Sequence, residues 1–259
     1  MDKSKPVSMP LSPQFKLSVN QSPKDDEHRR EMDKIPYANI VGSIMYTMVC
    51  TRPDISQGIS VVSRYMADPG LEHWHALKWI LRYLNGTQDY GILFDGSKEI
   101  EEQPLMGYCD SDFATNIDTR KSQSGYVFCL YGAAVSWRSS LQSVVALSTT
   151  EAEYISMSEA VKESIWLKGI CSDFGVDQET VTILCDSNSA ICLSKHQTFH
   201  ERSKHVDVKL HFVRDEVDKG SVKIQKVATE HNASDMLTKV LPGSKLKYCM
   251  DLVNLIQLK

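Results

Sequence analysis

Apolar side chains recur at helical spacing over the first third of the chain. Between Pro36 and Leu84 they fall three or four residues apart on three successive stretches, which indicates three short amphipathic helices. The pairs Arg52-Pro53 and Pro69-Gly70 interrupt this pattern between one stretch and the next. Segment 35–98 is therefore predicted to form a small helical bundle followed by a connector.

Residues 1–34 precede the predicted bundle and are mostly polar. They contain Pro6, Pro10, Pro13 and Pro23, and a charged run follows the last of these prolines. Such a segment has few apolar groups to bury and cannot offset the entropy of ordering. We therefore predict an extended, mostly disordered leader.

The spacing of apolar residues changes to two from Leu105 onward, as expected for β-strands. The predicted strands are 105–114, 125–131, 133–137, 181–185 and 222–227. The predicted helices are 149–174, 187–195, 204–219 and 233–239. Three strands followed by alternating helices and strands predict a mixed α/β fold, with a mixed sheet and helices on its faces. The expected α/β domain covers 99–242, and a helical tail covers 243–259.

Charge and cysteine content narrow the class of protein only slightly. The net charge of -4 does not indicate a nucleic-acid binder, although an acidic metal site would itself make the charge more negative. The seven cysteines are scattered and odd in number, which favours reduced thiols in a cytoplasmic or nuclear setting. Residues 1–13 lack the apolar centre of a signal peptide, and no apolar stretch reaches membrane-spanning length. We therefore expect no secretion and no membrane span.

Four carboxylates stand where predicted elements begin or end, namely Asp110, Glu153, Asp186 and Asp235. Each alone has an ordinary explanation as a turn, cap or first-turn residue. Asp186, however, follows a buried strand, and ligand sites of open α/β sheets lie beyond the carboxyl ends of strands. Carboxylates that converge can hold two hard divalent cations, and such a site cleaves phosphodiesters.

Glu151 and Glu153 compete for one of these four positions. Ser148 and Glu151 have the spacing of a capping box, in which Glu151 reaches back to the backbone N–H of Ser148. Glu153 lies two residues further along the predicted helix, about 200° around its axis, and needs another explanation. Either it is a solvated carboxylate favoured by the helix dipole, or it is the site residue.

Several strings of residues in a fixed order resemble the ribonuclease H domain of Ty1/copia-type retrotransposon Pol polyproteins. Upstream segments, among them Thr51-Arg52-Pro53-Asp54-Ile55, resemble the thumb and connection region of the reverse transcriptase that precedes this domain. The strings in the α/β part are Tyr108-Cys109-Asp110-Ser111-Asp112, Ala146-Leu147-Ser148-Thr149-Thr150-Glu151-Ala152-Glu153-Tyr154 and Cys185-Asp186-Ser187-Asn188-Ser189-Ala190.

This resemblance implies a ribonuclease H-like fold, with a five-stranded mixed sheet flanked by helices. It implies hydrolysis of the RNA strand of RNA–DNA hybrids during reverse transcription, with two Mg²⁺ ions that Mn²⁺ can replace. By position in the motifs, Asp110 would bridge both ions. Glu153 and Asp186 would hold the ion on the leaving-group side, and Asp235 the ion on the nucleophile side. His231 matches a mobile catalytic histidine of the family only loosely.

The resemblance also implies contacts with the hybrid. The candidate nucleic-acid-binding residues are Asn188, Arg202, Lys204, His205, Lys78 and Arg82. Asn188 has an alternative explanation as a helix cap, and the basic residues have one as solvated surface. The histidines between His196 and His211 also suggest zinc, but the chain has no C-x₂-C pair, which disfavours a zinc finger.

The polymerase motif of reverse transcriptases, Tyr-x-Asp-Asp, does not occur in the 259 residues. We therefore expect no DNA polymerisation, and a reverse-transcriptase palm from a longer polyprotein is a possible partner. The resemblance places such a protein in cytoplasmic virus-like particles or in the nucleus. The alternative function is a non-catalytic retroelement remnant that binds nucleic acid or protein. A secreted effector is disfavoured because no signal peptide is visible.

Overall fold

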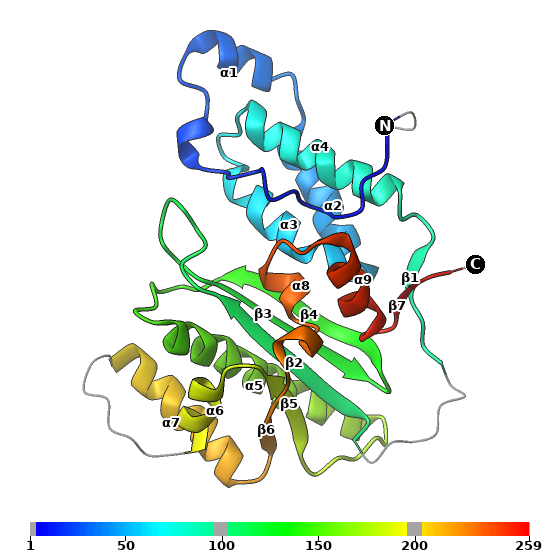
Figure 1. Cartoon of the computed structure of the whole chain (residues 1–259), viewed down its shortest axis with the longest axis vertical. Coiled ribbons are helices and arrows are strands. Elements are labelled where there is room, and N and C mark those ends of the chain that lie inside the picture. The colour runs from blue at the N-terminus through cyan, green and yellow to red at the C-terminus, as the bar shows by residue number, and fades with distance from the viewer. Residues whose placement is uncertain (1–3, 96–102, 196–203, 259) are drawn as a thin grey trace.

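The computed structural model describes residues 4–95, 103–195 and 204–258. A five-stranded sheet lies between two helical layers (Figure 1), and its strands follow the spatial order β4-β3-β2-β5-β6. The strands are β2 (Leu105–Asp112), β3 (Gln123–Leu130), β4 (Ala133–Leu141), β5 (Val181–Cys185) and β6 (Val222–Lys226). This is the five-stranded mixed sheet that the sequence and the family resemblance predict.

Strand directions bring the carboxylates of the central strands to one edge of the sheet. β2 pairs antiparallel with β3 and parallel with β5, and β5 pairs parallel with β6. Cys109 of β2 faces Cys185 of β5 in this register. Because these two strands run in the same direction, the residues that follow each cysteine, Asp110 and Asp186, lie at the same edge.

Three helices cover one face of the sheet, and they confirm three of the predicted helices. They are α5 (Thr149–Asp173), α6 (Asn188–Lys195) and α7 (Lys204–Asp218). Their apolar faces bury Tyr154, Val161 and Val213 against Phe128 and Ile183 of the sheet. Burial of such side chains stabilises the layer by roughly 1.5–3 kcal/mol each.

The opposite face carries the N-terminal bundle and the end of the chain. The bundle contains α2 (Tyr37–Thr51), η2 (Pro53–Ile55), α3 (Ser56–Val62), η3 (Ser63–Tyr65) and α4 (Leu71–Asn85). All three predicted helices are present, and the middle one is flanked by short 3₁₀ turns. The turn before it begins at Pro53, which cannot continue the preceding helix. The final elements on this face are η4 (Thr229–His231), α8 (Asp235–Thr238) and α9 (Gly243–Asp251).

The first segment differs from the disordered leader that its composition predicts. Residues 4–34 lie along the bundle and contain η1 (Val19–Gln21) and α1 (Asp26–Met32). Leu11, Leu17 and Met32 are buried, and the indole Nε1 of Trp79 donates to the carbonyl of Met9 at 2.9 Å. A few well-placed apolar side chains therefore order a segment whose average composition is polar.

The segment after the bundle and the end of the chain meet in a second, smaller sheet. The strand β1 (Tyr90–Ile92) pairs antiparallel with β7 (Leu255–Gln257), which follows α9. The helix of the tail was predicted, but the strand after it was not. In the part of the chain that the structure describes, every helix is too short or too polar to span a bilayer.

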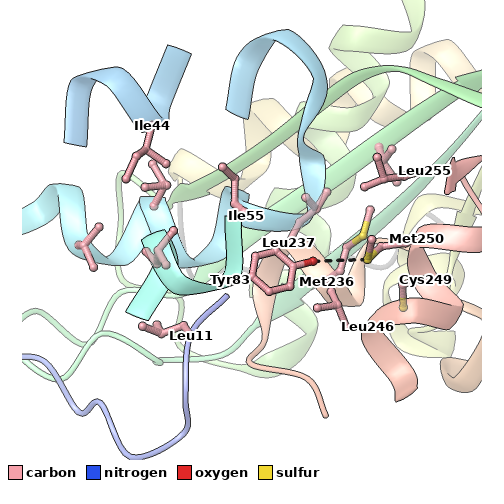
Figure 2. Close-up of a cluster of buried hydrophobic side chains, with 14 of the residues drawn as sticks. Leu11, Ile44, Ile55, Tyr83, Met236, Leu237, Leu246, Cys249, Met250 and Leu255 are labelled. Atoms are coloured by element: carbon pink, nitrogen blue, oxygen red, sulfur yellow. Dashed lines mark hydrogen bonds between the residues drawn. The ribbon is translucent and has the colours of Figure 1, made fainter. Parts of the chain in front are cut away.

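One hydrophobic core joins the bundle to the sheet. Figure 2 shows Ile55 of the bundle beside Met236 and Leu237 of α8, and Tyr83 facing Met250 of α9. The Tyr83 hydroxyl lies 3.7 Å from the Met250 sulfur. This packing crosses the predicted boundary between segments 35–98 and 99–242, and the boundaries themselves stay predictions.

Candidate functional site

Asp110 and Asp235 share one ammonium group at the edge of the sheet. Asp110 is fully buried near the end of β2, and Asp235 begins α8. The Nζ atom of Lys239 lies 3.0 Å from Oδ1 of Asp110 and 2.7 Å from Oδ1 of Asp235. The Thr238 hydroxyl donates to the second oxygen of Asp110. The short helix α8 and the residue after it thus place the Asp235 carboxylate and two hydrogen-bond donors, from Thr238 and Lys239, next to Asp110.

Glu153 and Asp186 form the other side of the same cluster. Ligand atoms of Glu153, Cys185 and Asp186 all lie within 4.8 Å of one another. The Oε2 atom of Glu153 is buried and has no hydrogen-bond partner. Glu153 is also close enough to Asp110 for their charges to interact. All four carboxylates predicted from the sequence are therefore neighbours in the structure.

Burial and mutual repulsion disfavour the charged forms of these carboxylates. Burial, with the negative charges of Asp110, Cys185 and Asp186, raises the pKa of Glu153 to about 9. Burial also raises the pKa of Asp110 to about 7, although Lys239 and Thr238 oppose this rise. Asp112, further along β2, has a pKa raised chiefly by burial. A group that is costly to ionise without a cation is suited to hold one.

Two buried hydrogen bonds fix the elements that carry the carboxylates. The Ser156 hydroxyl, one turn after Glu153 on α5, donates to the carbonyl of Asp110 at 2.6 Å. The Asn232 side-chain amide, just before α8, donates to the carbonyl of Cys109 at 3.1 Å. Both bonds end on the backbone of β2, so α5 and the segment before α8 are held against two adjacent residues of the same strand.

Gly125 allows α8 to approach the sheet. This glycine of β3 pairs with Asp110. A Cβ atom at position 125 would lie 2.7 Å from Cβ of Leu237 and 2.8 Å from Cγ2 of Thr238. Any side chain there would push α8, with Asp235, away from Asp110.

The competition between Glu151 and Glu153 has a clear structural outcome. Ser148 is the N-cap of α5, and its hydroxyl accepts from the N–H of Glu151 at 3.1 Å. The Glu151 carboxylate accepts from the N–H of Leu147 at 2.8 Å, one residue before the N–H expected from the capping box. Glu151 therefore caps the helix, and Glu153 faces the other carboxylates.

The donor set fits hard divalent cations. Carboxylate oxygens are the preferred ligands of Mg²⁺ and Mn²⁺, and Glu153 offers a buried oxygen that nothing else uses. The sulfur of Cys185 is a softer donor and is already engaged, because it accepts from the N–H of Ser187 at 3.4 Å and hydrogen-bonds the Cys109 thiol. We therefore regard the oxygens as the candidate ligands.

The predicted nucleic-acid-binding residues are not all at this site. Asn188 is exposed at the start of α6, two residues after Asp186. It lines a groove of about 660 Å³ with Lys195, Lys223 and Lys226. Asn188 is therefore placed where a strand of nucleic acid could reach both it and the carboxylates.

Lys78 and Arg82 lie elsewhere. They belong to α4, and α3 separates this helix from the sheet in Figure 1. The Lys78 ammonium lies 5.4 Å from the ring centre of Trp74, and the Arg82 guanidinium lies 5.0 Å from that of Trp79. The structure does not bring these two residues to the carboxylates. Arg202 lies outside the described residues, and Lys204 and His205 begin α7 with side chains outside the description.

His231, which matched a catalytic histidine of the family only loosely, is exposed and contacts α9. Its Nδ1 atom lies 2.6 Å from the hydroxyl of Tyr248 on α9.

Lys239, Thr238, Asn232 and Ser156 were not predicted from the sequence. One signal was available for Lys239, which follows Asp235 by four residues, the spacing of a helical ion pair. Nothing in the sequence indicated that the same ammonium also reaches Asp110, 129 positions away.

The fold and the site define a mixed α/β protein with a buried carboxylate cluster suited to divalent cations. The chain is 50% identical over 255 residues to the retrovirus-related Pol polyprotein from transposon TNT 1-94 of Nicotiana tabacum, which covers 98% of this chain and 19% of that protein. It is 35% identical over 239 residues to the Pol polyprotein from transposon RE2 of Arabidopsis thaliana, covering 92% of this chain and 16% of that protein. The chain belongs to the copia-type retrotransposon Pol polyprotein family, and it spans under a fifth of these relatives' length.

Two further proteins resemble parts of this chain. The secreted RxLR effector protein 161 of Plasmopara viticola is 48% identical over 136 residues, which cover 52% of this chain and 94% of that protein. A solved foamy viral protease–reverse transcriptase in complex with double-stranded DNA is 13% identical, with a TM-score of 0.49 over 79% of this chain and 42% of that one. No family model matches the chain.

Proposed function

We propose that this chain is the ribonuclease H part of a copia-type Pol polyprotein and hydrolyses the RNA strand of RNA–DNA hybrids. The observation that supports this most directly is the buried, unpartnered oxygen of Glu153, beside Asp186 and within charge range of Asp110. A buried polar atom without a partner is costly, and a bound cation would remove that cost. Two carboxylate pairs around one edge of a sheet suit two divalent ions.

The roles of the residues follow from their positions. Two divalent ions, when bound, supply the positive charge that activates water and stabilises the leaving 3′ oxygen. Glu153 and Asp186 would hold one of them, Asp235 the other, and Asp110 lies between these two groups. Ser156 and Asn232 orient the cluster through the backbone of β2.

The hybrid would approach along the groove beside α6 and β6. Lys195, Lys223 and Lys226 line this groove and can contact phosphates, while the Asn188 amide can donate to or accept from a base edge or ribose. The Lys226 ammonium donates to the backbone carbonyl of Asp186, so the basic side of the groove adjoins the carboxylates. We propose no such role for Lys78 and Arg82.

Cleavage of an RNA–DNA hybrid labelled on the RNA strand tests this proposal. The full chain should cleave the RNA in Mg²⁺ or Mn²⁺ and leave it intact in EDTA. Glu153→Gln should reduce the rate by at least about a hundredfold, because it removes a metal ligand. Glu151→Gln makes the same chemical change two residues away in the cap, so the rate should be nearly unchanged. Equal losses in the two variants would show that the assignment of Glu153 is wrong.

The same experiment separates the alternative function. Hybrid binding without cleavage in either metal would favour a non-catalytic binding module. Polymerisation is not expected from this chain, because it lacks Tyr-x-Asp-Asp. A reverse-transcriptase palm would have to come from other parts of a longer polyprotein.

A further inference from the structure

Lys239 is placed between two carboxylates that are both proposed to hold metal. It is the residue at which α8 ends, in extended backbone conformation, and its side chain is 33% exposed. Its ammonium lies 3.0 Å from Asp110 and 2.7 Å from Asp235, and both carboxylates are almost completely buried. No other lysine among the described residues contacts both aspartates.

The Lys239 ammonium offsets the repulsion between Asp110 and Asp235 in the metal-free protein. Two buried carboxylates side by side repel each other, and a cation between them offsets this repulsion. A divalent ion held by the same two oxygens would have to replace the ammonium at Oδ1 of each aspartate. The lysine stem is flexible and reaches solvent, so the ammonium can leave without any movement of α8.

The two sides of the cluster differ in this respect. Glu153 has a buried oxygen with no partner, and no lysine or arginine among the described residues forms a salt bridge with its carboxylate. A cation can therefore bind at Glu153 and Asp186 in exchange for the Glu153 proton, without displacing a basic side chain. On the side of Asp235, it must first displace Lys239.

We propose that Lys239 is an internal counterion that keeps Asp110 and Asp235 together without metal and competes with the second divalent ion. The consequence is ordered metal binding, with the Glu153–Asp186 side filled at lower concentration than the Asp110–Asp235 side. This inference rests on the proposed two-metal function. It makes Lys239 a positioning residue that sets the metal concentration at which the site becomes complete.

Binding of Mn²⁺ to the full chain tests the proposal. Calorimetry and the electron paramagnetic resonance signal of free Mn²⁺ measure the binding. The unmodified protein should bind two ions with unequal dissociation constants. Lys239→Met keeps the length of the stem and removes the charge. It should tighten the weaker site by about tenfold or more and leave the stronger one nearly unchanged.

Lys245→Met is the matched control. The Lys245 ammonium lies 3.4 Å from Oδ2 of Asp235 and does not bridge to Asp110. This variant loses the same charge near the site. Because Lys245 contacts Asp235 but not Asp110, its loss should tighten the weaker site by less than the loss of Lys239 does. Equal effects of the two substitutions would mean that overall charge, and not the bridge, controls affinity, and would overturn the proposal.

Thermal melting adds a readout that does not depend on activity. In EDTA, Lys239→Met should melt at a lower temperature than the unmodified protein, and Mn²⁺ should raise its melting temperature by a larger amount. Lys239→Gln serves as a second neutral variant if the methionine variant does not fold.

Two negative results have different meanings. If the unmodified protein binds two Mn²⁺ ions and Lys239→Met changes neither constant nor the melting response, only the role of Lys239 is overturned. If no variant binds Mn²⁺, the metal site and the proposed function fail, and this inference fails with them.

Discussion

Asp110 and Glu153 carry the same chemical group in different surroundings. Asp110 receives hydrogen bonds from Lys239 and Thr238, which favour its charged form and hold its pKa to about 7 against burial. Glu153 has no such donor on its buried oxygen, and its pKa rises to about 9. Protonation of the metal-free site is therefore uneven near neutral pH.

These pKa values predict how the stability of the metal-free protein depends on pH. In the unfolded chain, glutamate titrates near 4.3, so between about pH 4.5 and 9 the folded state binds more protons at Glu153 than the unfolded state does. Stability then falls as pH rises through this window, and Asp110 adds to the fall up to about pH 7. In EDTA, the melting temperature should be higher at pH 5.5 than at pH 8.5.

Glu153→Gln is the control for this prediction. Its melting temperature should depend less on pH over the same range, because the glutamine cannot ionise. A melting temperature that rises from pH 5.5 to 8.5 in the unmodified protein, or an unchanged slope in the variant, would contradict the surroundings assigned to Glu153.

The four carboxylates were predicted because each stands where an element begins or ends and because their motifs resemble those of the copia-type ribonuclease H domain. Spacing explained Glu151 as a cap but left Glu153 open between a solvated carboxylate and a site residue, and the resemblance favoured the site. Lys239 and Asn232 could not be predicted, since their partners Asp110 and Cys109 are more than a hundred positions distant. Lys78 was assigned to the nucleic acid because of the family resemblance, but a resemblance in sequence does not show what that face of α4 meets.

At the scale of elements, the four-residue helix α8 depends on its neighbours. A helix of this length is not stable alone, because helix nucleation is unfavourable and few hydrogen bonds follow. It is held by the hydrogen bonds of Asn232, by the close approach to Gly125 and by Met236 and Leu237 in the shared core (Figure 2). The position of Asp235 is therefore set by packing.

Gly125→Ala tests this dependence. The added methyl group would meet Leu237 and Thr238 at less than 3 Å, so α8 must shift or the strand must bend. We expect a loss of about 1–3 kcal/mol in the free energy of unfolding, as for overpacked cores, and weaker Mg²⁺ binding. Denaturant unfolding and Mg²⁺ titration measure the two effects.

Gly169→Ala is the matched control for that substitution. Gly169 lies within α5, and a Cβ atom there would have nothing within 4 Å. The same change should stabilise the protein by roughly 0.5–1 kcal/mol and leave Mg²⁺ binding unchanged. A Gly125→Ala variant that bound Mg²⁺ normally would show that α8 tolerates displacement.

Most elements were predictable because their periodicity is local. The helices of the bundle and the strands of the central sheet have clear apolar spacing over at least five residues. The pairing of β1 with β7 was not predictable, because its two three-residue strands lie far apart in the sequence, one between the bundle and the central sheet and the other near the end of the chain. The ordered leader was missed for a similar reason, since Leu11 and Leu17 find their partners only in the folded bundle.

At the scale of the whole molecule, the bundle and the carboxylate cluster share one core. α8 contacts η2 and α3 on one side and the sheet on the other. Ile55 and Ile59 of the bundle belong to the same buried cluster as Met236 and Leu237. The bundle therefore supports the element that delivers Asp235, although the sequence assigned none of its residues to the carboxylate cluster.

Ile55→Ala should accordingly weaken metal binding from a distance. Ile55 is fully buried, and its truncation leaves a cavity next to α8, at a cost of about 2–5 kcal/mol in the free energy of unfolding. Because α8 loses part of its support, Asp235 should be less well held and the weaker of two Mn²⁺ sites should bind less tightly. Val213→Ala, in the separate core beneath the sheet, should destabilise the protein without this effect. Calorimetric Mn²⁺ titration well below both melting temperatures distinguishes the two variants. If both bind Mn²⁺ like the unmodified protein, the bundle stabilises the fold but does not position the site.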